Sequence, residues 1–238
     1  MRKEISIVAV ADTKINETII SLRISSRKIN CKKVILLSSA NIDTSKAFKE
    51  LEVIKINSLN SLKDYNHFII YELHKYIQTS HIILVQWDGF ILNQNKWVDD
   101  FLKYDYIGAP FIPRAENFKY SRDKCKDFYC IGNGGFSLRS LSLLKAPSKY
   151  KLEDNALETF NHEDGFFSVY YRKFLESKGF KWAPFSLAKR FSLESPITFK
   201  EFINLPFGFH GKKLLKLHPK ILFLRMCDYF YMKLKIKS

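Results

Sequence analysis

Residues 81–90 read HIILVQWDGF, an apolar run that ends on an acid between a tryptophan and a glycine. Residues 81–86 show no alternation of polar and apolar side chains, which is typical of a strand covered on both faces. Asp88, just beyond that strand, has two interpretations. It is either a turn aspartate that bonds its own backbone, or an acid held at the sheet edge for chemistry. Taken alone, the run favours the turn.

Strand-like and helix-like segments alternate before this run. The patterns predict strands over residues 5–11, 33–37 and 53–56, and helices over residues 13–29, 47–51 and 65–78, the last capped by Asp64. The alternation indicates an α/β fold with a Rossmann-like, mainly parallel central sheet flanked by helices. Ligands of such sheets bind beyond the carboxyl ends of the strands, which is where Asp88 stands.

Beyond residue 100 the pattern changes. We expect a short strand within 104–111, a polar loop or lid over Pro113–Tyr129, a helix from a cap at Asn161 to about Lys178 that stops at Gly179, a strand-like and irregular stretch over 181–194, and a tight turn around His210. The expected organisation is a domain over residues 1–211 followed by a basic tail helix over 212–238.

Composition limits the class of protein. The 238 residues are 46% hydrophobic, enough for one sizeable core. The N-terminal apolar run is short and broken by Asp12, which indicates a first strand and not a signal peptide. No stretch approaches the roughly 20 apolar residues of a membrane span. The cysteines match no zinc pattern and fit free thiols in a reducing cytoplasm, although Cys125 and Cys130 could pair or bind a metal.

The formal net charge is +15, and such a chain suits nucleic acid, an anionic membrane or a phosphorylated substrate. Residues 212–238 carry eight basic residues and one acid, Asp228, a net charge of +7. Because a nucleic-acid groove is more often assembled from several parts of a fold, we expect no nucleic-acid partner. A basic nucleic-acid-binding module is kept as an alternative, and it requires a steep salt dependence of affinity.

Two segments further along combine glycines with acids. Residues 132–136 read GNGGF, where glycines allow a positive φ or a close approach of a ligand to the backbone. A plain hairpin turn is the alternative. Residues 162–164 read HED at a helix start, where acids complete caps and suit the helix dipole. The functional alternative is a general base that takes a proton from an acceptor hydroxyl.

Basic and imidazole side chains give two further candidates. His210 stands between small residues in GFHG, which leaves the ring uncrowded, as a metal ligand requires. A structural histidine is the alternative. Lys189 and Arg190, in AKRFS, could add positive charge beside a leaving phosphate or form a solvated basic turn.

These segments form an ordered set, QWDGF, YDYIGAPF, IGNGGFSLRS, HEDGFFS, KWAP, RFSLE and FGFHG. The set resembles a bacterial family of largely unassigned function that is classed with the glycosyltransferases, and the resemblance covers about residues 64–211. The order of the motifs is also similar to that of the GT-A glycosyltransferase fold. The resemblance implies a sugar transfer from a nucleotide-diphosphate donor, most simply a UDP-sugar, to a glycan or glycolipid acceptor.

The resemblance implies a divalent metal, Mn²⁺ or Mg²⁺, on the donor diphosphate. Asp88 matches the last acid of the Asp-x-Asp motif, and His210 matches a late histidine that completes the metal shell. Gln86 departs from the pattern, since the first motif position is usually an acid. A neutral amide binds a metal only through its carbonyl oxygen, so a non-catalytic sugar-nucleotide-binding protein is an alternative.

The resemblance also implies an inverting transfer with Asp164, or its neighbour Glu163, as the general base. The pocket between donor sugar and acceptor would be lined by Asn133, Gly134, Gly135 and Phe136. We expect the nucleotide to lie over Ala11, Asp12, Thr13, Tyr65 and Trp87. This expectation rests on where such folds bind ligands and not on a sequence motif.

The tail has two interpretations. Residues 221–232 are nearly all apolar or aromatic and are followed by lysines. Such a helix suits the surface of an anionic membrane, with lysines reaching the headgroups. The alternative is a helix packed on the domain's own core. A peripheral position on the cytoplasmic membrane would agree with a lipid-carried acceptor in bacterial surface polysaccharide or lipopolysaccharide synthesis.

Overall fold

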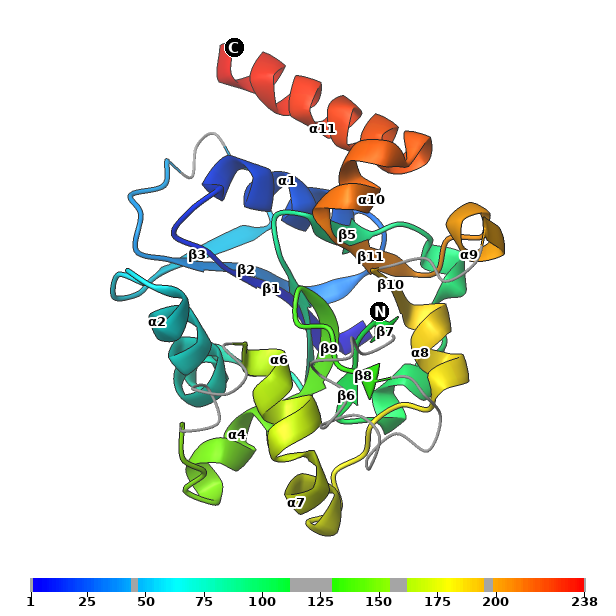
Figure 1. The fold of residues 1–238 in the computed structure, drawn as a ribbon. Coiled ribbons are helices and arrows are strands. Elements are labelled where there is room, and N and C mark those ends of the chain that lie inside the picture. Colours follow the sequence, from blue (N-terminus) through cyan, green and yellow to red (C-terminus); the bar gives the residue numbers. More distant parts are fainter. Residues whose placement is uncertain (1, 44–46, 112–129, 155–161, 195–198, 238) are drawn as a thin grey trace.

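The computed structural model describes residues 2–43, 47–111, 130–154, 162–194 and 199–237. Figure 1 shows helices on both faces of a central sheet, with the C-terminal helix lying outside one of the helical layers. The predicted loop over 113–129 and the predicted cap at Asn161 lie outside the described residues.

The central sheet has six strands, in the order β3 (Leu51–Lys55), β2 (Cys31–Ser38), β1 (Arg2–Val10), β4 (His81–Val85), β9 (Phe136–Ser140) and β6 (Tyr106–Ile107). The four strands β1 to β4 run parallel, and β9 pairs antiparallel with both β4 and β6. The predicted mainly parallel α/β sheet is confirmed.

The longer helices are α1 (Ile15–Ser26), α2 (Leu62–His67), α4 (Leu141–Lys149), α7 (Arg172–Ser177), α8 (Phe185–Phe191), α10 (Lys212–Leu217) and α11 (Pro219–Lys237). Shorter turns of helix are α6 (Glu163–Gly165) and α9 (Phe199–Ile203), the π-helical segments η2 (Phe68–Glu72) and η7 (Phe166–Tyr170), and the 3₁₀ segments η3 (Leu73–Tyr76), η4 (Gln94–Lys96) and η5 (Asp99–Lys103).

The centre of the sheet is buried on both faces. In β1, Ile7 and Ala9 belong to the core cluster that contains Ile19 and Leu22 of α1, whereas Val8 and Val10 belong to the cluster around α2 and η2. Successive strand residues point to opposite faces. A strand between two helical layers therefore has no polar face, which explains the unbroken apolar run over 82–85 in β4.

Some local predictions are wrong. Residues 47–50 form turns and not a helix. Helix α2 is capped by Ser61, whose hydroxyl accepts a hydrogen bond from Asp64 N at 3.1 Å. Asp64 instead accepts one from Asn60 N at 3.0 Å, an arrangement close to the capping box. Residues 185–191, predicted as irregular, form helix α8.

The predicted helix before Gly179 consists of α6, η7 and α7, with a π-helical interruption between the two α-helical parts. Gly179 has a φ of 92°, which a residue with a side chain rarely adopts, and the helix ends just before it. The predicted stop is therefore confirmed.

A small second sheet joins the two segments that carry the candidate metal ligands. It contains β10 (Ser192–Leu193), β11 (Gly208–His210) and β5 (Gly89–Ile91). His210 is thus the last residue of a strand and not the centre of a tight turn. The antiparallel register of β5 and β11 sets His210 opposite Gly89, and Gly211 N donates to Asp88 O at 3.0 Å. A further pair, β7 (Pro110–Phe111) and β8 (Cys130–Ile131), is also antiparallel.

Residues 212–237, predicted as part of a single tail helix, form two helices, α10 and α11. The longer one, α11, lies over α1 on the side away from the sheet (Figure 1). Its inner face is anchored by Asp228, which forms ion pairs with Arg23 and Arg27 of the α1 region. Arg23 also lies 3.7 Å from the ring centre of Tyr231. Among the described helices, none combines the length and the apolar character that crossing a bilayer requires.

Candidate functional site

A cavity of about 410 Å³ opens at the carboxyl end of β1. Its lining includes each residue predicted to contact the nucleotide, namely Ala11, Asp12, Thr13, Tyr65 and Trp87, together with Gln86. The remaining lining residues come from the end of β1, from α1 and from residues 59–62. The structure therefore brings these five residues together at the sheet edge where α/β folds bind ligands, whereas Lys189 and Arg190, also predicted on the donor side, line another pocket.

Asp12 shapes the wall of this cavity. Its carboxylate accepts hydrogen bonds from Ser39 N at 2.6 Å, Ser39 Oγ at 2.7 Å, Leu59 N at 2.7 Å and Ser38 Oγ at 3.2 Å. Burial alone would raise the pKa of Asp12, but the hydrogen bonds from Leu59, Ser39 and Ser38 outweigh it and hold the pKa below its usual value. Both oxygens are thus engaged in joining β1 to the loops that follow β2 and β3.

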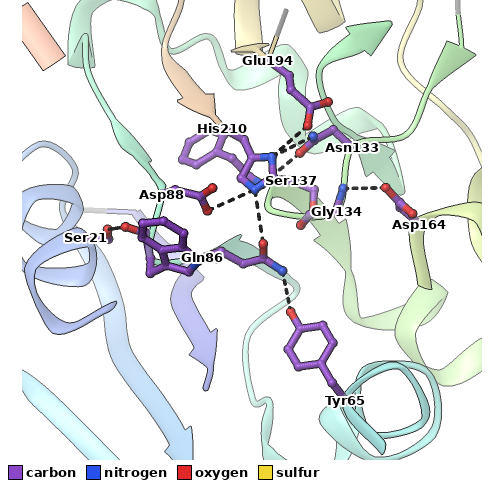
Figure 2. A network of polar contacts seen from close by, with 12 residues as sticks. Ser21, Tyr65, Gln86, Asp88, Asn133, Gly134, Ser137, Asp164, Glu194 and His210 are labelled. Atoms are coloured by element: carbon purple, nitrogen blue, oxygen red, sulfur yellow. Dashed lines mark hydrogen bonds and ion pairs between the residues drawn. The ribbon is translucent and has the colours of Figure 1, made fainter. Parts of the chain in front are cut away.

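Three polar side chains meet beside the cavity, as Figure 2 shows. His210 Nε2 lies 3.3 Å from Asp88 Oδ1 and 3.2 Å from Gln86 Oε1. Gln86 Nε2 donates to Tyr65 OH at 2.9 Å. Because the amide nitrogen is engaged by Tyr65, the amide oxygen of Gln86 faces the imidazole. The structure therefore unites the predicted metal residues Asp88, His210 and Gln86.

The far side of the imidazole is held by Glu194 and Asn133 (Figure 2). His210 Nδ1 lies 3.1 Å from Glu194 Oε1 and 3.0 Å from Asn133 Nδ2. Burial alone would lower the pKa of His210, but Asp88 and Glu194 outweigh it and raise this pKa to about 9. Sequence reasoning missed Glu194, although it is the final residue of the RFSLE motif.

The donor atoms suit a divalent cation. When Nδ1–H donates to Glu194, the Nε2 lone pair faces the oxygens of Asp88 and Gln86, and only a proton or a cation satisfies all three acceptors. Octahedral ligands about 2.1 Å from a small divalent ion lie about 3 Å apart, close to the 3.2 and 3.3 Å observed here. Asp88 is buried, and the contact that the described residues make with its Oδ1 is the His210 ring nitrogen at 3.3 Å.

The set differs from a metal site built of charged ligands. Within the described residues, no three or more His, Cys, Asp and Glu side chains are arranged to hold a metal ion. The site combines one carboxylate, one imidazole and the neutral amide of Gln86. Its protein ligands therefore supply a single negative charge, and we expect a weaker cation site than two acids would form.

Two of the three glycines of the GNGGF segment, Gly134 and Gly135, leave room for side chains of the site. A Cβ on Gly135 would lie 2.1 Å from His210 Nε2, and one on Gly134 would lie 2.2 Å from Glu163 Oε1. Among the described glycines, a positive φ occurs at Gly179 and Gly211. The expectation of a positive φ within GNGGF is thus wrong, whereas the close approach is real and involves the protein's own side chains.

Glu163 is engaged in a buried ion pair. Its Oε2 lies 2.7 Å from Arg139 Nη1, and both side chains are almost fully buried. Arg139 also donates to Ser137 Oγ at 3.0 Å and to Tyr106 OH at 3.3 Å. A carboxylate in such a pair is poorly suited to accept a proton, because losing its charge would leave the buried Arg139 unpaired.

Asp164, unlike Glu163, forms no ion pair with Arg139. Its carboxylate accepts hydrogen bonds from Gly134 N at 3.2 Å and from Gly165 N at 2.8 Å. Burial, followed by the charge of Glu163, raises the pKa of Asp164 to about 6. Asn133 contacts His210 and Gly134 contacts Asp164, so these two adjacent residues lie between the candidate metal ligands and the acid pair (Figure 2).

Some predicted residues lie elsewhere. Phe136 is fully buried in the core and does not line the cavity. Lys189 and Arg190 line a separate pocket with Lys96 and Glu201. Lys189 Nζ lies 2.5 Å from Glu201 Oε1, and Arg190 Nε donates to Lys96 O at 3.3 Å.

Two lysines that the sequence reasoning missed lie near Trp87, one of the residues that line the cavity. The Nζ atoms of Lys14 and Lys212 lie 5.8 and 5.5 Å from the ring centre of Trp87. Lys14 has a φ of 55°, uncommon for a residue with a side chain. The only signal for Lys212 in the sequence is its position two residues after His210.

The architecture is that of the GT-A glycosyltransferases. The chain is similar to the galactosyltransferase LgtC, solved with donor and acceptor sugar analogs, with a TM-score of 0.61, 12% identity and coverage of 93% of this chain and 95% of that one. It is also similar to the apo form of the glycosyltransferase GlyE from Streptococcus pneumoniae TIGR4, with a TM-score of 0.56 and 14% identity over 98% of this chain and 62% of that one.

A family model matches residues 49–210, and the chain belongs to that family, described as "Protein of unknown function (DUF5672)". No curated protein matches the chain. At these low identities the solved structures establish a shared fold, and the chemistry has to be argued from the residues of this chain.

Proposed function

We propose that this protein is a divalent-metal-dependent glycosyltransferase that moves a sugar from a nucleoside-diphosphate donor to a saccharide or lipid-linked acceptor. The observation that carries the proposal is the meeting of Asp88, His210 and the amide oxygen of Gln86 beside a 410 Å³ cavity, with Asp164 across the Asn133–Gly134 segment.

On the donor side, Asp88, His210 and Gln86 would hold Mn²⁺ or Mg²⁺. When bound, the ion supplies a Lewis acid that stabilises the charge developing on the leaving diphosphate. Lys14 and Lys212, beside Trp87, add positive charge at the same edge. The base and ribose of the donor, most simply uridine, would lie in the cavity.

On the acceptor side, Asp164 is the proposed general base. Its carboxylate Oδ takes the proton of the acceptor hydroxyl while that oxygen attacks the anomeric carbon of the donor sugar. The raised pKa of about 6 makes Asp164 a stronger base than an ordinary aspartate, while it remains ionised at neutral pH. This role gives inversion of configuration, which ¹H NMR of the product anomeric proton would test.

The outer face of α11 supports an anionic membrane as the place of action, and hence a lipid-linked acceptor in surface polysaccharide or lipopolysaccharide synthesis. Leu222, Phe223, Met226 and Phe230 are 41 to 66% exposed on this helix. Apolar side chains of this kind, with lysines nearby, suit an anionic lipid surface. Sedimentation with vesicles of phosphatidylglycerol against phosphatidylcholine, using Phe223→Ser/Phe230→Ser, tests the surface.

The central experiment is a thermal-shift screen of nucleotide sugars with and without Mn²⁺, followed by a turnover assay. A ligand that binds the folded state raises stability by RT ln(1 + [L]/Kd). Asp88→Ala and His210→Ala should abolish the Mn²⁺-dependent shift and turnover, whereas Asp100→Asn, an exposed acid paired with Lys103, should not. Unchanged behaviour of both site variants would contradict the metal assignment.

The turnover assay also separates the alternatives. Binding of a sugar nucleotide without transfer or hydrolysis would indicate a non-catalytic GT-A protein. A steep salt-dependent affinity for oligonucleotides with no nucleotide-sugar effect would instead indicate a nucleic-acid-binding module.

A further inference from the structure

The C-terminal helix reaches the candidate donor site through one side chain. Arg225 of α11 donates through Nη1 to Trp87 O at 2.6 Å and to Ser21 Oγ at 3.2 Å. Ser21 Oγ itself donates to Trp87 O at 3.0 Å (Figure 2). This contact joins α11, α1 and the residue that stands between Gln86 and Asp88.

The Gln86–Gly89 turn is held by its carbonyl groups. Gln86 O accepts from Gly89 N at 3.1 Å within the turn, and Asp88 O accepts from Gly211 N at 3.0 Å. The carbonyl between them belongs to Trp87, and Arg225 and Ser21 are its donors. This carbonyl belongs to the peptide that joins Trp87 to Asp88, so its orientation bears on the direction in which the Asp88 side chain leaves the backbone.

The helix that carries Arg225 is firmly attached to the domain. Asp228, one turn further along α11, is buried and paired with Arg23 of α1. Ile221, one turn earlier, is fully buried. Arg225 is thus fixed at both ends of its helical segment, so its guanidinium is held at one place beside the turn.

The positive charge of Arg225 lies beside the Gln86–Gly89 turn without a direct acidic partner among the described residues. Both of its hydrogen-bond acceptors are uncharged, and within the described residues no carboxylate lies within ion-pair distance. Burial lowers the pKa of Arg225, and the nearby charges of Glu17 and Asp88 oppose this effect. A partly buried cation that contacts a carbonyl, with no acid as its direct partner, favours negative charge at Asp88 and at a diphosphate bound there.

We infer that Arg225 is a positioning residue for the donor site, which makes the tail helix part of the catalytic domain and not only an attachment. The inference rests on the proposed function. In it, the α11 side chain fixes the Trp87–Asp88 peptide, and the fixed peptide presents Asp88 toward His210.

The test compares Arg225→Gln with Lys220→Gln. The control removes a charge and a hydrogen bond, to Asn93 Oδ1 at 3.0 Å, from the same helix but away from the turn. Arg225→Gln should lower Mn²⁺ affinity in the presence of a nucleoside diphosphate by roughly 10- to 100-fold, the range for loss of an outer partner of a metal ligand. Arg225→Lys, which keeps the charge, should recover part of the loss.

Amide hydrogen exchange gives a readout that does not depend on activity. Arg225→Gln should accelerate exchange in peptides covering residues 86–92 while leaving the peptides of β1 unchanged, and Lys220→Gln should leave both unchanged. Unaltered exchange over 86–92, or equal Mn²⁺ affinity in the Arg225→Gln and Lys220→Gln variants, would overturn the inference. If the wild type shows no metal-dependent turnover, the proposed function is refuted. Faster exchange over residues 86–92 in Arg225→Gln would in that case still support the positioning role of Arg225.

Discussion

Glu163→Gln isolates the role of the buried pair that Glu163 forms with Arg139. In the wild type the two side chains meet at 2.7 Å, and Arg139 is fully buried. The substitution removes a negative charge and leaves the guanidinium with neutral partners, Ser137 Oγ and Tyr106 OH among them. We therefore expect a loss of stability and a lower pKa of the neighbouring Asp164.

The magnitude follows from the burial of both partners. Breaking a buried ion pair by removing one member costs about 3–5 kcal/mol, because the other charge stays buried without compensation. The amide oxygen of glutamine can still accept one hydrogen bond from Arg139, which favours the lower end. For a chain of this size, about 3 kcal/mol corresponds to a fall in Tm of roughly 6–12 °C.

The assay combines thermal unfolding with the pH dependence of kcat/KM. Glu72→Gln is the matched control, since Glu72 pairs with Lys75 at 2.6 Å on the surface, where such pairs contribute about 0–1 kcal/mol. Burial and, after it, the charge of Glu163 raise the pKa of Asp164, so removing that charge should move the acidic limb of the profile to lower pH. A fall in Tm no larger than that of the control, with an unmoved acidic limb, would refute this reasoning.

Further predictions concern the site itself. Transfer by the wild type should fall as pH drops through about 6, where Asp164 becomes protonated, and Asp164→Asn should abolish turnover while sparing the thermal shift by nucleotide; retained turnover would exclude it as the base. Gln86→Glu adds a negative charge, so Mn²⁺ alone should bind roughly tenfold tighter or more by titration calorimetry. Tyr65→Phe removes the hydrogen-bond partner of the Gln86 amide nitrogen and should weaken Mn²⁺ binding. Weaker Mn²⁺ binding by Gln86→Glu together with tighter binding by Tyr65→Phe would exclude Gln86 as a ligand. Gly135→Ala puts a methyl group 2.1 Å from His210 Nε2, so the Mn²⁺-dependent thermal shift should disappear, and a normal shift would contradict the close packing.

The sheet could be predicted because its determinants are local. A strand covered on both faces has to be apolar throughout, and β4 is. The position of Asp88 beyond that strand then follows from the chain itself. By contrast, the sequence does not predict α8, because its seven residues are too few to show a helical period. Its capping position is Pro184, which provides no side-chain cap.

The contacts between distant segments could not be predicted. The sequence shows an amide at Gln86, yet its orientation depends on Tyr65, which lies in α2 and accepts from the amide nitrogen. The role of Glu194 depends on the pairing of β10 with β11, which sets this acid beside the imidazole of His210. Neither relation leaves a spacing or a period in the sequence.

Glu163 and Asp164 show how the surroundings of a carboxylate decide whether it can act as a general base. Glu163 and Asp164 are adjacent and chemically alike, and either could serve as a base by residue type. Successive residues of a helix point about 100° apart, so the two carboxylates face different surroundings. Glu163 meets Arg139, a fully buried cation from β9, and its charge is required there. Asp164 meets a backbone N–H of the GNGGF segment, close to that same pair. Burial and then the negative charge of Glu163 raise the pKa of Asp164, and the different roles proposed for the two acids follow from the position of one arginine.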